Sequence, residues 1–271
     1  MDSNLRKLQL VQVEILEIID SICKKNNINY SLYAGSLLGA VRHGGFIPWD
    51  DDLDVCMLRK DYNKFVDVWS KETHNGYILQ NKENTPTFTQ SFTKIRKEST
   101  TYIQYEWEKG LYDTGIFVDV FPIDRLPDSK IKRMLFFWNC MRYQLYTREF
   151  APPKSNFLIR FGSRLLLLFS DKNSRSRKRK VLLSKITKYN ENNSLELLSI
   201  ESMSRMRVTL PCDLLDFFVT IQFENSKYMC VKEWDVYLKQ TYGNYMELPP
   251  VVERTWTHSP ILLDFSNSYM V

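Results

Sequence analysis

The sequence predicts an α+β fold in which a small mixed sheet with packed helices is joined to a mostly helical part. Between about residues 28 and 126, short β-forming segments alternate with helix-forming segments. After Pro127 the pattern becomes helical through about Tyr189. The 271 residues are 44% hydrophobic with only 9 Gly and 10 Pro, a composition that supports a substantial core.

The first predicted element is an amphipathic helix that ends at Asn26-Asn27, because apolar residues from Leu5 to Ile22 recur near one side. The segments that follow are a strand near 29–34, a helix at 36–42, a strand at 52–57, a helix at 60–71, strands near 77–80, 90–96 and 100–106, and a strand at 115–121. Beyond the helical part, strand-rich segments near 197–210 and 217–223 precede a last helix at about 232–242.

The domain organisation follows from this order of elements. We expect one domain over residues 1–271, with a core at about 28–126, a helical part at about 127–190 and a C-terminal part at about 191–271. No internal repeat or low-complexity linker divides the chain.

Four carboxylates, Asp50, Asp51, Asp52 and Asp54, lie within five positions of the sequence. Adjacent like charges repel unless cations or water screen them. In an extended strand alternate side chains share a face, so Asp52 and Asp54 are expected to converge on one point. Hard oxygen ligands arranged in this way suit Mg²⁺. The alternative is a solvated acidic turn, which the apolar strand that continues after the acids disfavours.

Upstream of the acids, Gly35-Ser36 separates a short predicted strand from a predicted helix. Glycine allows close approach of the backbone, and the free N–H groups at the start of a helix favour an anion. We therefore interpret this turn as a phosphate cradle. Gly-Ser turns are common, so the interpretation depends on the nearby acids.

A further carboxylate, Asp119, lies between Val118 and Val120 in a strongly β-forming run. Burial of an isolated charge is unfavourable unless the charge is paired or bound to a metal. Asp119 is therefore expected to complete a set with Asp52 and Asp54.

The motifs GSLLGAVRHGGFIPWDDDLDV, GIFVDVFPID and YGNYMELPPVVER, with a later His258, resemble those of the LicD family of phosphotransferases, which is related to the fukutin-type proteins. The resemblance covers about residues 8–265, with no family signature from 127 to about 203. It implies a nucleotidyltransferase-like fold. It also implies metal-dependent transfer of phosphocholine, or a related phospho-alcohol, from a CDP-alcohol to a sugar hydroxyl of a cell-surface glycan precursor, with release of CMP.

The resemblance also assigns roles to residues. Gly35 and Ser36 match the phosphate-binding turn, Asp52 and Asp54 match the metal-binding pair, and Asp119 matches the third carboxylate. The implied cofactor is Mg²⁺, with Mn²⁺ as the alternative. The implied donor is CDP-choline, with ribitol or glycerol as other alcohols, and the acceptor is a teichoic acid, capsule or lipopolysaccharide-type glycan, free or lipid-linked. Asp119 is also a candidate to accept the proton of the acceptor hydroxyl.

Five further residues are candidates to bind the substrate phosphates. Arg42 and His43 follow the predicted helix at 36–42, Lys94 lies in a strand-like segment, and Arg254 and His258 follow the C-terminal motif. For Lys94 a solvated strand residue is the alternative, because most lysines are exposed. The five cysteines show no CxxC spacing, so neither a zinc site nor a redox pair is expected.

The net charge of +5 is concentrated in residues 172–180, directly after an apolar stretch at 157–169. The segment 157–180 therefore predicts peripheral contact with a membrane surface. The alternative is that Leu165 to Phe169 belong to the core and that the basic run is a solvated loop. Nucleic-acid binding is not expected, because the basic run lacks interleaved aromatic residues. The sequence shows neither a secretory leader nor an apolar run of about 20 residues, so we expect a cytoplasmic location, free or peripheral at the inner face of the membrane.

Two other function classes stay open at this level. A nucleotidyltransferase would use the same carboxylates at the α-phosphate of an NTP and would release pyrophosphate. A non-catalytic binding protein of a glycan pathway would keep the fold without a complete set of acids, whereas all three acids are present here.

Overall fold

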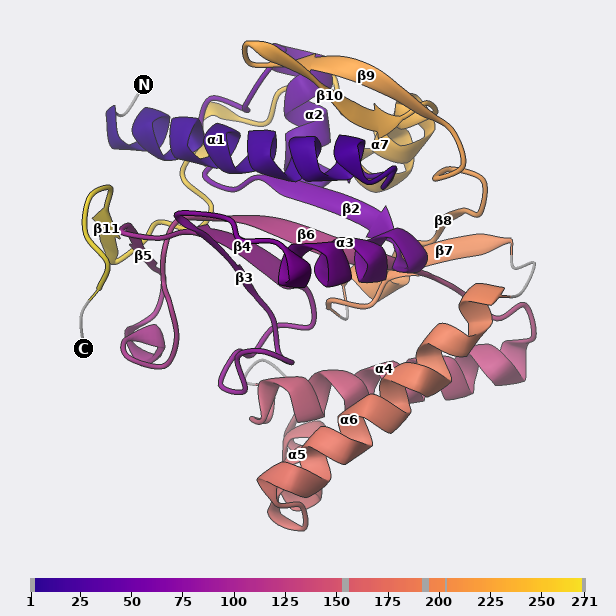
Figure 1. Ribbon diagram of the computed structural model, residues 1–271. Coiled ribbons are helices and arrows are strands. Elements are labelled where there is room, and N and C mark those ends of the chain that lie inside the picture. The colour runs from indigo at the N-terminus through magenta and orange to yellow at the C-terminus, as the bar shows by residue number, and fades with distance from the viewer. Residues whose placement is uncertain (1–2, 153–155, 192–194, 203, 270–271) are drawn as a thin grey trace. The chain divides into compact units, whose positions relative to one another are not determined.

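The computed structural model describes residues 3–152, 156–191, 195–202 and 204–269, and its fold is α+β, as predicted. The helices are α1 (Ser3–Lys25), α2 (Ala34–His43), α3 (Arg59–Lys71), α4 (Lys130–Arg148), α5 (Phe157–Leu168), α6 (Lys172–Thr187) and α7 (Trp234–Tyr242) (Figure 1). The strands are β1 (Ser31–Leu32), β2 (Asp54–Leu58), β3 (Tyr77–Gln80), β4 (Thr93–Lys97), β5 (Thr101–Ile103), β6 (Phe117–Arg125), β7 (Glu196–Ser199), β8 (Leu210–Pro211), β9 (Phe218–Phe223), β10 (Ser226–Val231) and β11 (Leu262–Asp264). Short 3₁₀ helices cover Glu106–Glu108, Lys188–Glu191, Arg205–Arg207 and Val251–Glu253.

The chain divides into two compact units. Unit 1 comprises Met1–Gln80, Phe92–Pro122 and Asp213–Val271, and unit 2 comprises Asn81–Ser91 and Ile123–Cys212. In unit 1 the strands follow the order β1-β2-β6-β4-β3 in a mixed sheet. Helices α1 and α3 contact each other and strands of this sheet, and α2 contacts β1 and β2 of the sheet as well as β9 (Figure 1).

The predicted N-terminal helix is confirmed as α1, whose buried side includes Leu8, Ile15 and Ile19. Helix α2 begins earlier than predicted. Its first residue, Ala34, has a φ of +47°, so the break in the chain precedes Gly35 and Ser36, which lie in the first helical turn. The helix therefore begins two residues earlier than predicted, and Gly35 and Ser36 belong to the helix itself.

Several predicted strands differ in extent, and among the described residues β10 and β11 were not predicted. Strand β2 begins at Asp54 instead of Asp52, β1 covers only two residues of the predicted 29–34, and the strand predicted at 100–106 ends at Ile103. Strand β10 forms a hairpin with β9 around a turn in which Glu224 has a φ of +53°. Strand β11 pairs with β5, so it depends on a partner far away in the sequence, which no local pattern reveals.

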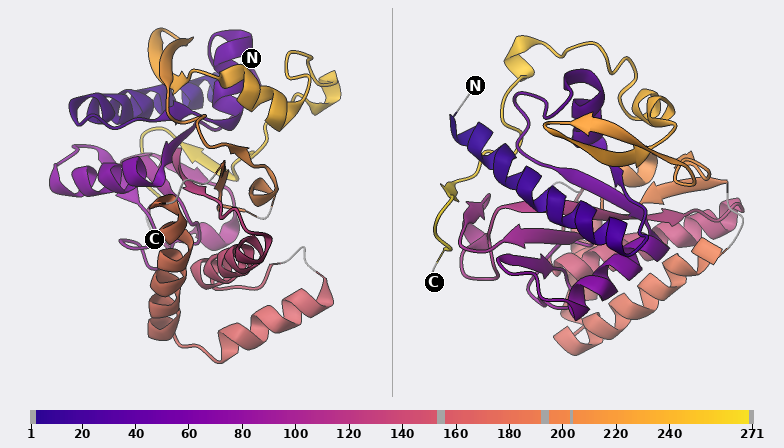
Figure 2. Two further views of the ribbon diagram at one scale, coloured as in Figure 1. Left: turned by 90° about the vertical axis from the view of Figure 1, so that its right-hand side faces the viewer. Right: turned by 45° about the horizontal axis from the view of Figure 1, so that its top comes forward.

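Unit 2 carries the predicted helical part. Strand β7 pairs with the last residues of β6, and β8 pairs with β7. Helices α4 and α6 pack together over a core that includes Phe136, Cys140, Tyr146, Leu182 and Ile186 (Figure 2). The basic run at 172–180 is helical and is therefore not a loop. Within the described residues, no helix is both long and apolar enough to cross a bilayer.

Candidate active site

The acidic residues lie on a loop that leads into β2, and helix α1 holds this loop through two buried glutamines. Gln9 donates from Nε2 to the carbonyl oxygen of Asp50 at 2.9 Å, and Gln12 donates in the same way to Asp51 at 3.0 Å. Both glutamines are at most 1% exposed. The sequence analysis missed them, although two Gln residues on the apolar side of a helix were an available signal.

Gly35 and Ser36 contact the acids directly. A Cβ at Gly35 would lie 2.6 Å from Oδ2 of Asp50, so only glycine admits that carboxylate at the start of α2. The Ser36 hydroxyl accepts the N–H of Asp54 at 2.8 Å. The N–H groups of Ser36 and Leu37 already donate to Tyr33, at 3.0 and 3.3 Å. The turn thus positions the acids, and its role as a phosphate cradle stays a prediction.

Asp51 connects the acidic loop to the C-terminal segment. Its buried carboxylate accepts the backbone N–H of His258 at 2.9 Å and lies 3.3 Å from His258 Nδ1 and 3.4 Å from the Tyr102 hydroxyl. His258 Nδ1 also lies 3.4 Å from Oδ2 of Asp52. Because Asp51 is 1% exposed and Asp54 is 7% exposed, the alternative of a solvated acidic turn is wrong.

Asp119 pairs with Lys94. The two residues are direct partners in the register of β4 and β6, and Lys94 Nζ donates to Asp119 Oδ1 at 2.6 Å. Lys94 Nζ also lies 3.2 Å from the ring centroid of Phe117, a cation–π contact. Lys94 is buried, so the alternative of a solvated strand residue is wrong. The Asp119 N–H donates to the Leu53 carbonyl at 3.0 Å, which fixes β6 beside the acidic loop.

Burial dominates the electrostatics of this site. It raises the pKa of Asp50, and the charges of Asp52 and Asp51 raise it further. Burial also raises the pKa of Asp52, where His258 and Lys94 oppose the shift while Asp119 and Asp51 add to it. The pKa of Asp119 is raised by burial in spite of Lys94, and burial lowers the pKa of Lys94 in spite of Asp119. A cation bound here would stabilise the ionised carboxylates.

The carboxylate oxygens of this site fit a hard divalent cation, whereas the imidazole nitrogen of His258 is a softer donor. Among the described residues, ligand atoms of Asp51, Asp52 and His258 lie within 4.8 Å of one another. The predicted set of Asp52, Asp54 and Asp119 shares only Asp52 with this group. Carboxylate oxygens suit Mg²⁺ or Mn²⁺. Since Asp51 already accepts hydrogen bonds from His258, Asp52 is the acid of this group with more capacity left for a metal.

Of the remaining candidates for phosphate binding, His43 and Arg254 contact Trp49, which directly precedes the acids, and burial together with the charge of Arg42 lowers the pKa of His43. Arg254 lies with Cζ 5.4 Å from the Trp49 ring centroid, and His43 meets the same ring edge-on at 6.1 Å. Arg42 donates to the Tyr245 carbonyl at 2.9 Å, and burial followed by the charge of Arg254 lowers its pKa. Among the described residues Arg42 Nε is buried without an acceptor. Two arginines whose charges repel each other favour a bound anion between them.

The structure thus brings the predicted residues into two adjoining groups, both in unit 1. The first group, around the acids, contains Gly35, Ser36, Asp52, Asp54, Lys94, Asp119 and His258, and the second, around Trp49, contains Arg42, His43 and Arg254. Sequence reasoning missed Asp51, Gln9 and Gln12 as the residues that hold the first group together. A site with crowded carboxylates beside two arginines can bind a metal ion and a phosphorylated ligand together.

Comparison with known proteins identifies the family that this sequence resembles. The sequence model described as LicD/FKTN/FKRP, nucleotidyltransferase domain, matches residues 27–157. The chain is 31% identical over 261 residues to the lipopolysaccharide cholinephosphotransferase LicD of Haemophilus influenzae, over 91% of this chain and 92% of that protein.

Two uncharacterized proteins of Rickettsia species match shorter stretches. The protein of Rickettsia typhi is 35% identical over 77 residues, which cover 28% of this chain and 25% of that protein. The protein of Rickettsia prowazekii is 26% identical over 145 residues, which cover 54% of this chain and 48% of that protein.

Proposed function

The chain belongs to the LicD family, and on this premise we propose that it transfers phosphocholine, or a related phospho-alcohol, from a CDP-alcohol to a sugar hydroxyl of a cell-surface glycan precursor, with release of CMP. The similarity to the Haemophilus influenzae cholinephosphotransferase over nearly the whole length of both chains carries this proposal. CDP-choline is the favoured donor. The acceptor class is a teichoic acid, capsule or lipopolysaccharide-type glycan.

Mg²⁺, with Mn²⁺ as the alternative, is proposed to bind at Asp52, Asp54 and Asp119. The raised pKa values of Asp52 and Asp119 support a cation site, because burial disfavours both ionised carboxylates and the charges of Asp119 and Asp51 add to this effect at Asp52. When bound, the ion neutralises negative charge on the donor phosphates and on the departing CMP.

The chain's own residues bind and orient the donor in this proposal. Arg42 and Arg254 are proposed to bind the diphosphate; the charge of Arg254 lowers the pKa of Arg42, and Arg254 lies over the Trp49 ring, which supports this role. Gly35 and Ser36 hold the acids against the start of α2. His258 carries a pKa raised by its hydrogen bond to Asp51, so it can donate to a phosphate oxygen while protonated.

Asp119 is the proposed acceptor of the sugar hydroxyl proton. Its Oδ1 is bound by Lys94. Burial raises the pKa of Asp119, which favours proton acceptance, while Lys94 and a bound cation would oppose that shift and keep the carboxylate ionised, as a base must be. Lys94 is proposed to fix the orientation of this carboxylate.

The acceptor is proposed to be lipid-linked and to meet the enzyme at the inner face of the membrane. The segment 157–180 supports this location, because α5 exposes apolar side chains next to the basic helix α6. A cytoplasmic enzyme in peripheral contact with the membrane would reach such an acceptor directly.

The test is CMP release from CDP-choline, CDP-ribitol and CDP-glycerol with Mg²⁺, each with and without a glycan acceptor. We expect CMP from one donor, and loss of that activity in Asp52→Asn and in Asp119→Asn. The matched control is Asp67→Asn, which removes an exposed carboxylate paired with Lys71. Thermal melting of all variants verifies that they fold.

Two outcomes would contradict the proposal. Release of pyrophosphate from an NTP, without CMP from any CDP-alcohol, would assign nucleotidyl transfer. Activity retained in both Asp52→Asn and Asp119→Asn would show that the acids are not the reactive centre.

A further inference from the structure

Helix α5 exposes almost its entire apolar surface. Phe157, Leu158, Leu168 and Phe169 are 76–78% exposed, and Leu167 is the buried residue of the helix. Figure 2 shows α5 extending from the pair of α4 and α6. Contiguous exposed apolar surface of this kind marks an interaction site. The alternative that residues 165–169 form core is therefore wrong for all but Leu167.

Helix α4 adds a second apolar surface, which the sequence analysis did not single out. Ile131, Met134, Leu135 and Trp138 are 51–70% exposed. Their spacing of three and four residues places them on one side of the helix. Arg142 lies one turn beyond Trp138 on the same side. This apolar stripe therefore continues into a basic region.

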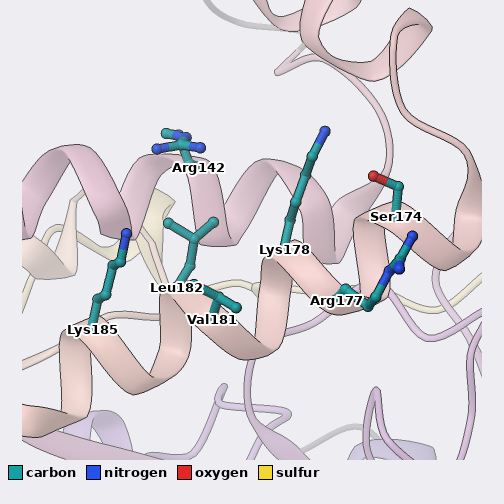
Figure 3. A pocket seen from close by; sticks show the side chains of 7 residues that line it. All are labelled: Arg142, Ser174, Arg177, Lys178, Val181, Leu182 and Lys185. Carbon is teal, nitrogen blue, oxygen red and sulfur yellow. The ribbon is translucent and has the colours of Figure 1, made fainter.

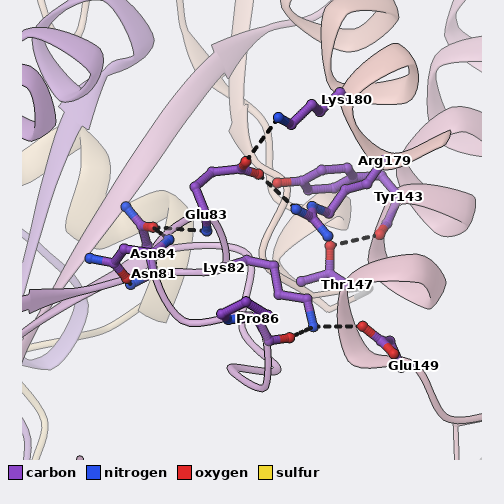
Figure 4. A network of polar contacts seen from close by, with 10 residues as sticks. All are labelled: Asn81, Lys82, Glu83, Asn84, Pro86, Tyr143, Thr147, Glu149, Arg179 and Lys180. Carbon is purple, nitrogen blue, oxygen red and sulfur yellow. Dashed lines mark hydrogen bonds and ion pairs between the residues drawn. The ribbon is translucent and has the colours of Figure 1, made fainter. Parts of the chain in front are cut away.

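The three helices carry charge of one sign. Five Lys or Arg residues lie in α4, two in α5 and seven in α6, and none of the three helices contains Asp or Glu. On one side of α6 the cations have partners within unit 2. Figure 4 shows Arg179 and Lys180 with Glu83, at 2.8 and 3.7 Å, and Lys82 with Glu149 at 2.9 Å. Glu149 also pairs with Arg175 at 3.2 Å.

On the other side of α6 the cations have no such partners among the described residues. Arg142 from α4 and Arg177, Lys178 and Lys185 from α6 line a hollow of about 240 Å³ (Figure 3). Within the described parts of the chain none of these four side chains forms an ion pair. Four unpaired cations around one hollow repel one another, and an anion would relieve that repulsion.

We propose that α4, α5 and α6 form a docking surface for a membrane that contains anionic phospholipids. The apolar sides of α5 and α4 enter the lipid interface, with Trp138 at headgroup level, and the hollow receives a phosphate-bearing headgroup. A nucleic acid or acidic protein would match the charge but leave α5 uncovered. A second copy of the chain would cover α5 but would bring cations of one sign together. This inference deepens the membrane contact proposed above for residues 157–180 by adding α4 and the phosphate-binding hollow, and it does not depend on the donor or the chemistry.

The experiment is flotation of the full chain with phosphatidylcholine vesicles that contain or lack phosphatidylglycerol, at low and high salt. We expect strong binding only with phosphatidylglycerol, weakened by salt. The triple variant R177Q/K178Q/K185Q should bind on the order of 100-fold more weakly, since each cation near an anionic surface contributes a roughly fivefold effect. F157S/F161S should also lose binding, at either salt concentration.

The control K7Q/K227Q/K232Q removes the same charge from exposed positions of unit 1. It should bind like the wild type. Absence of wild-type flotation with phosphatidylglycerol, or equal losses in the control, would overturn the inference. A lipid-free dimer that F157S/F161S dissociates, measured by light scattering, would assign α5 to self-association instead. CMP release from a water-soluble donor should be unchanged in all of these variants, so this test is independent of catalysis.

Discussion

Replacement of Asp51 by asparagine is expected to release the C-terminal segment around His258. The buried carboxylate accepts the His258 N–H at 2.9 Å and faces His258 Nδ1 at 3.3 Å and the Tyr102 hydroxyl at 3.4 Å. Hydrogen bonds to a charged group stabilise a fold by about 1.5–3 kcal/mol. Loss of the charge also relieves repulsion of Asp50 and Asp52, whose pKa values Asp51 raises. The His258 side chain is 39% exposed, so solvent screens its interaction with the Asp51 carboxylate and reduces the stabilisation that this interaction contributes. The expected loss in the free energy of unfolding is therefore about 1–3 kcal/mol.

The loss in the free energy of unfolding caused by Asp51→Asn should depend on pH. The hydrogen bond to Asp51 raises the pKa of His258 in the folded state above its ordinary value of 6.5. A group with a raised folded pKa contributes its full stabilisation below the unfolded pKa and loses it as the pH rises through the folded pKa. Asp51→Asn should therefore destabilise the protein most below about pH 6.5 and less in alkaline buffer. The destabilisation that remains in alkaline buffer comes from the hydrogen bond between the His258 backbone N–H and Asp51, which does not depend on protonation of the imidazole.

The assay is urea denaturation of metal-free protein at acidic and alkaline pH, combined with NMR titration of the histidines. Only three histidines are present, so His258 can be assigned by comparison with His258→Gln. The matched control is Asp264→Asn, because Asp264, at the end of β11, accepts the Ser266 N–H at 2.8 Å in an exposed hydrogen bond. Equal stability of wild type and Asp51→Asn at both pH values, with an unchanged pKa of His258, would refute the reasoning.

Three further predictions concern the residues around the acids. Gly35→Ala should lower CMP release by at least about tenfold, because its Cβ would meet Asp50 Oδ2 at 2.6 Å and displace that carboxylate; wild-type turnover would argue against this contact. Lys94→Met should cost about 3 kcal/mol of unfolding free energy, since it leaves Asp119 buried without its ion partner, and an unchanged urea midpoint would contradict it. Mg²⁺ should raise the melting temperature, and the increment should grow as the pH rises above about 4, because protons compete for carboxylates whose folded pKa values lie above 3.8. In metal-free protein the same raised pKa values should make the free energy of unfolding fall as the pH rises through them. The measurement for Mg²⁺ is thermal melting against an EDTA control. A Mg²⁺-dependent increase in melting temperature that is zero, or that does not change with pH, would count against the metal site.

The sequence by itself determined those features that depend on near neighbours. The apolar period of α1 and the alternating segments that became α2, α3, β3 and β4 are local patterns, and each is confirmed. The crowding of Asp50 to Asp54 and the lone acid in an apolar run at Asp119 identified the candidate carboxylates, because the cost of unpaired charge is a local property of composition.

Only the tertiary structure decided which distant residues meet. The contact between Asp51 and His258 joins positions 207 residues apart, and the strand β11 exists only because β5 lies beside it. From the sequence, residues 165–169 were equally compatible with a buried core and with an exposed interface. In the structure only Leu167 of these residues is buried, so the segment is mostly exposed. Long-range closure depends on the summed packing of many elements. For that reason the sequence could name Asp52, Asp54 and Asp119 but could not reveal that Asp51, Gln9 and Gln12 hold the site together.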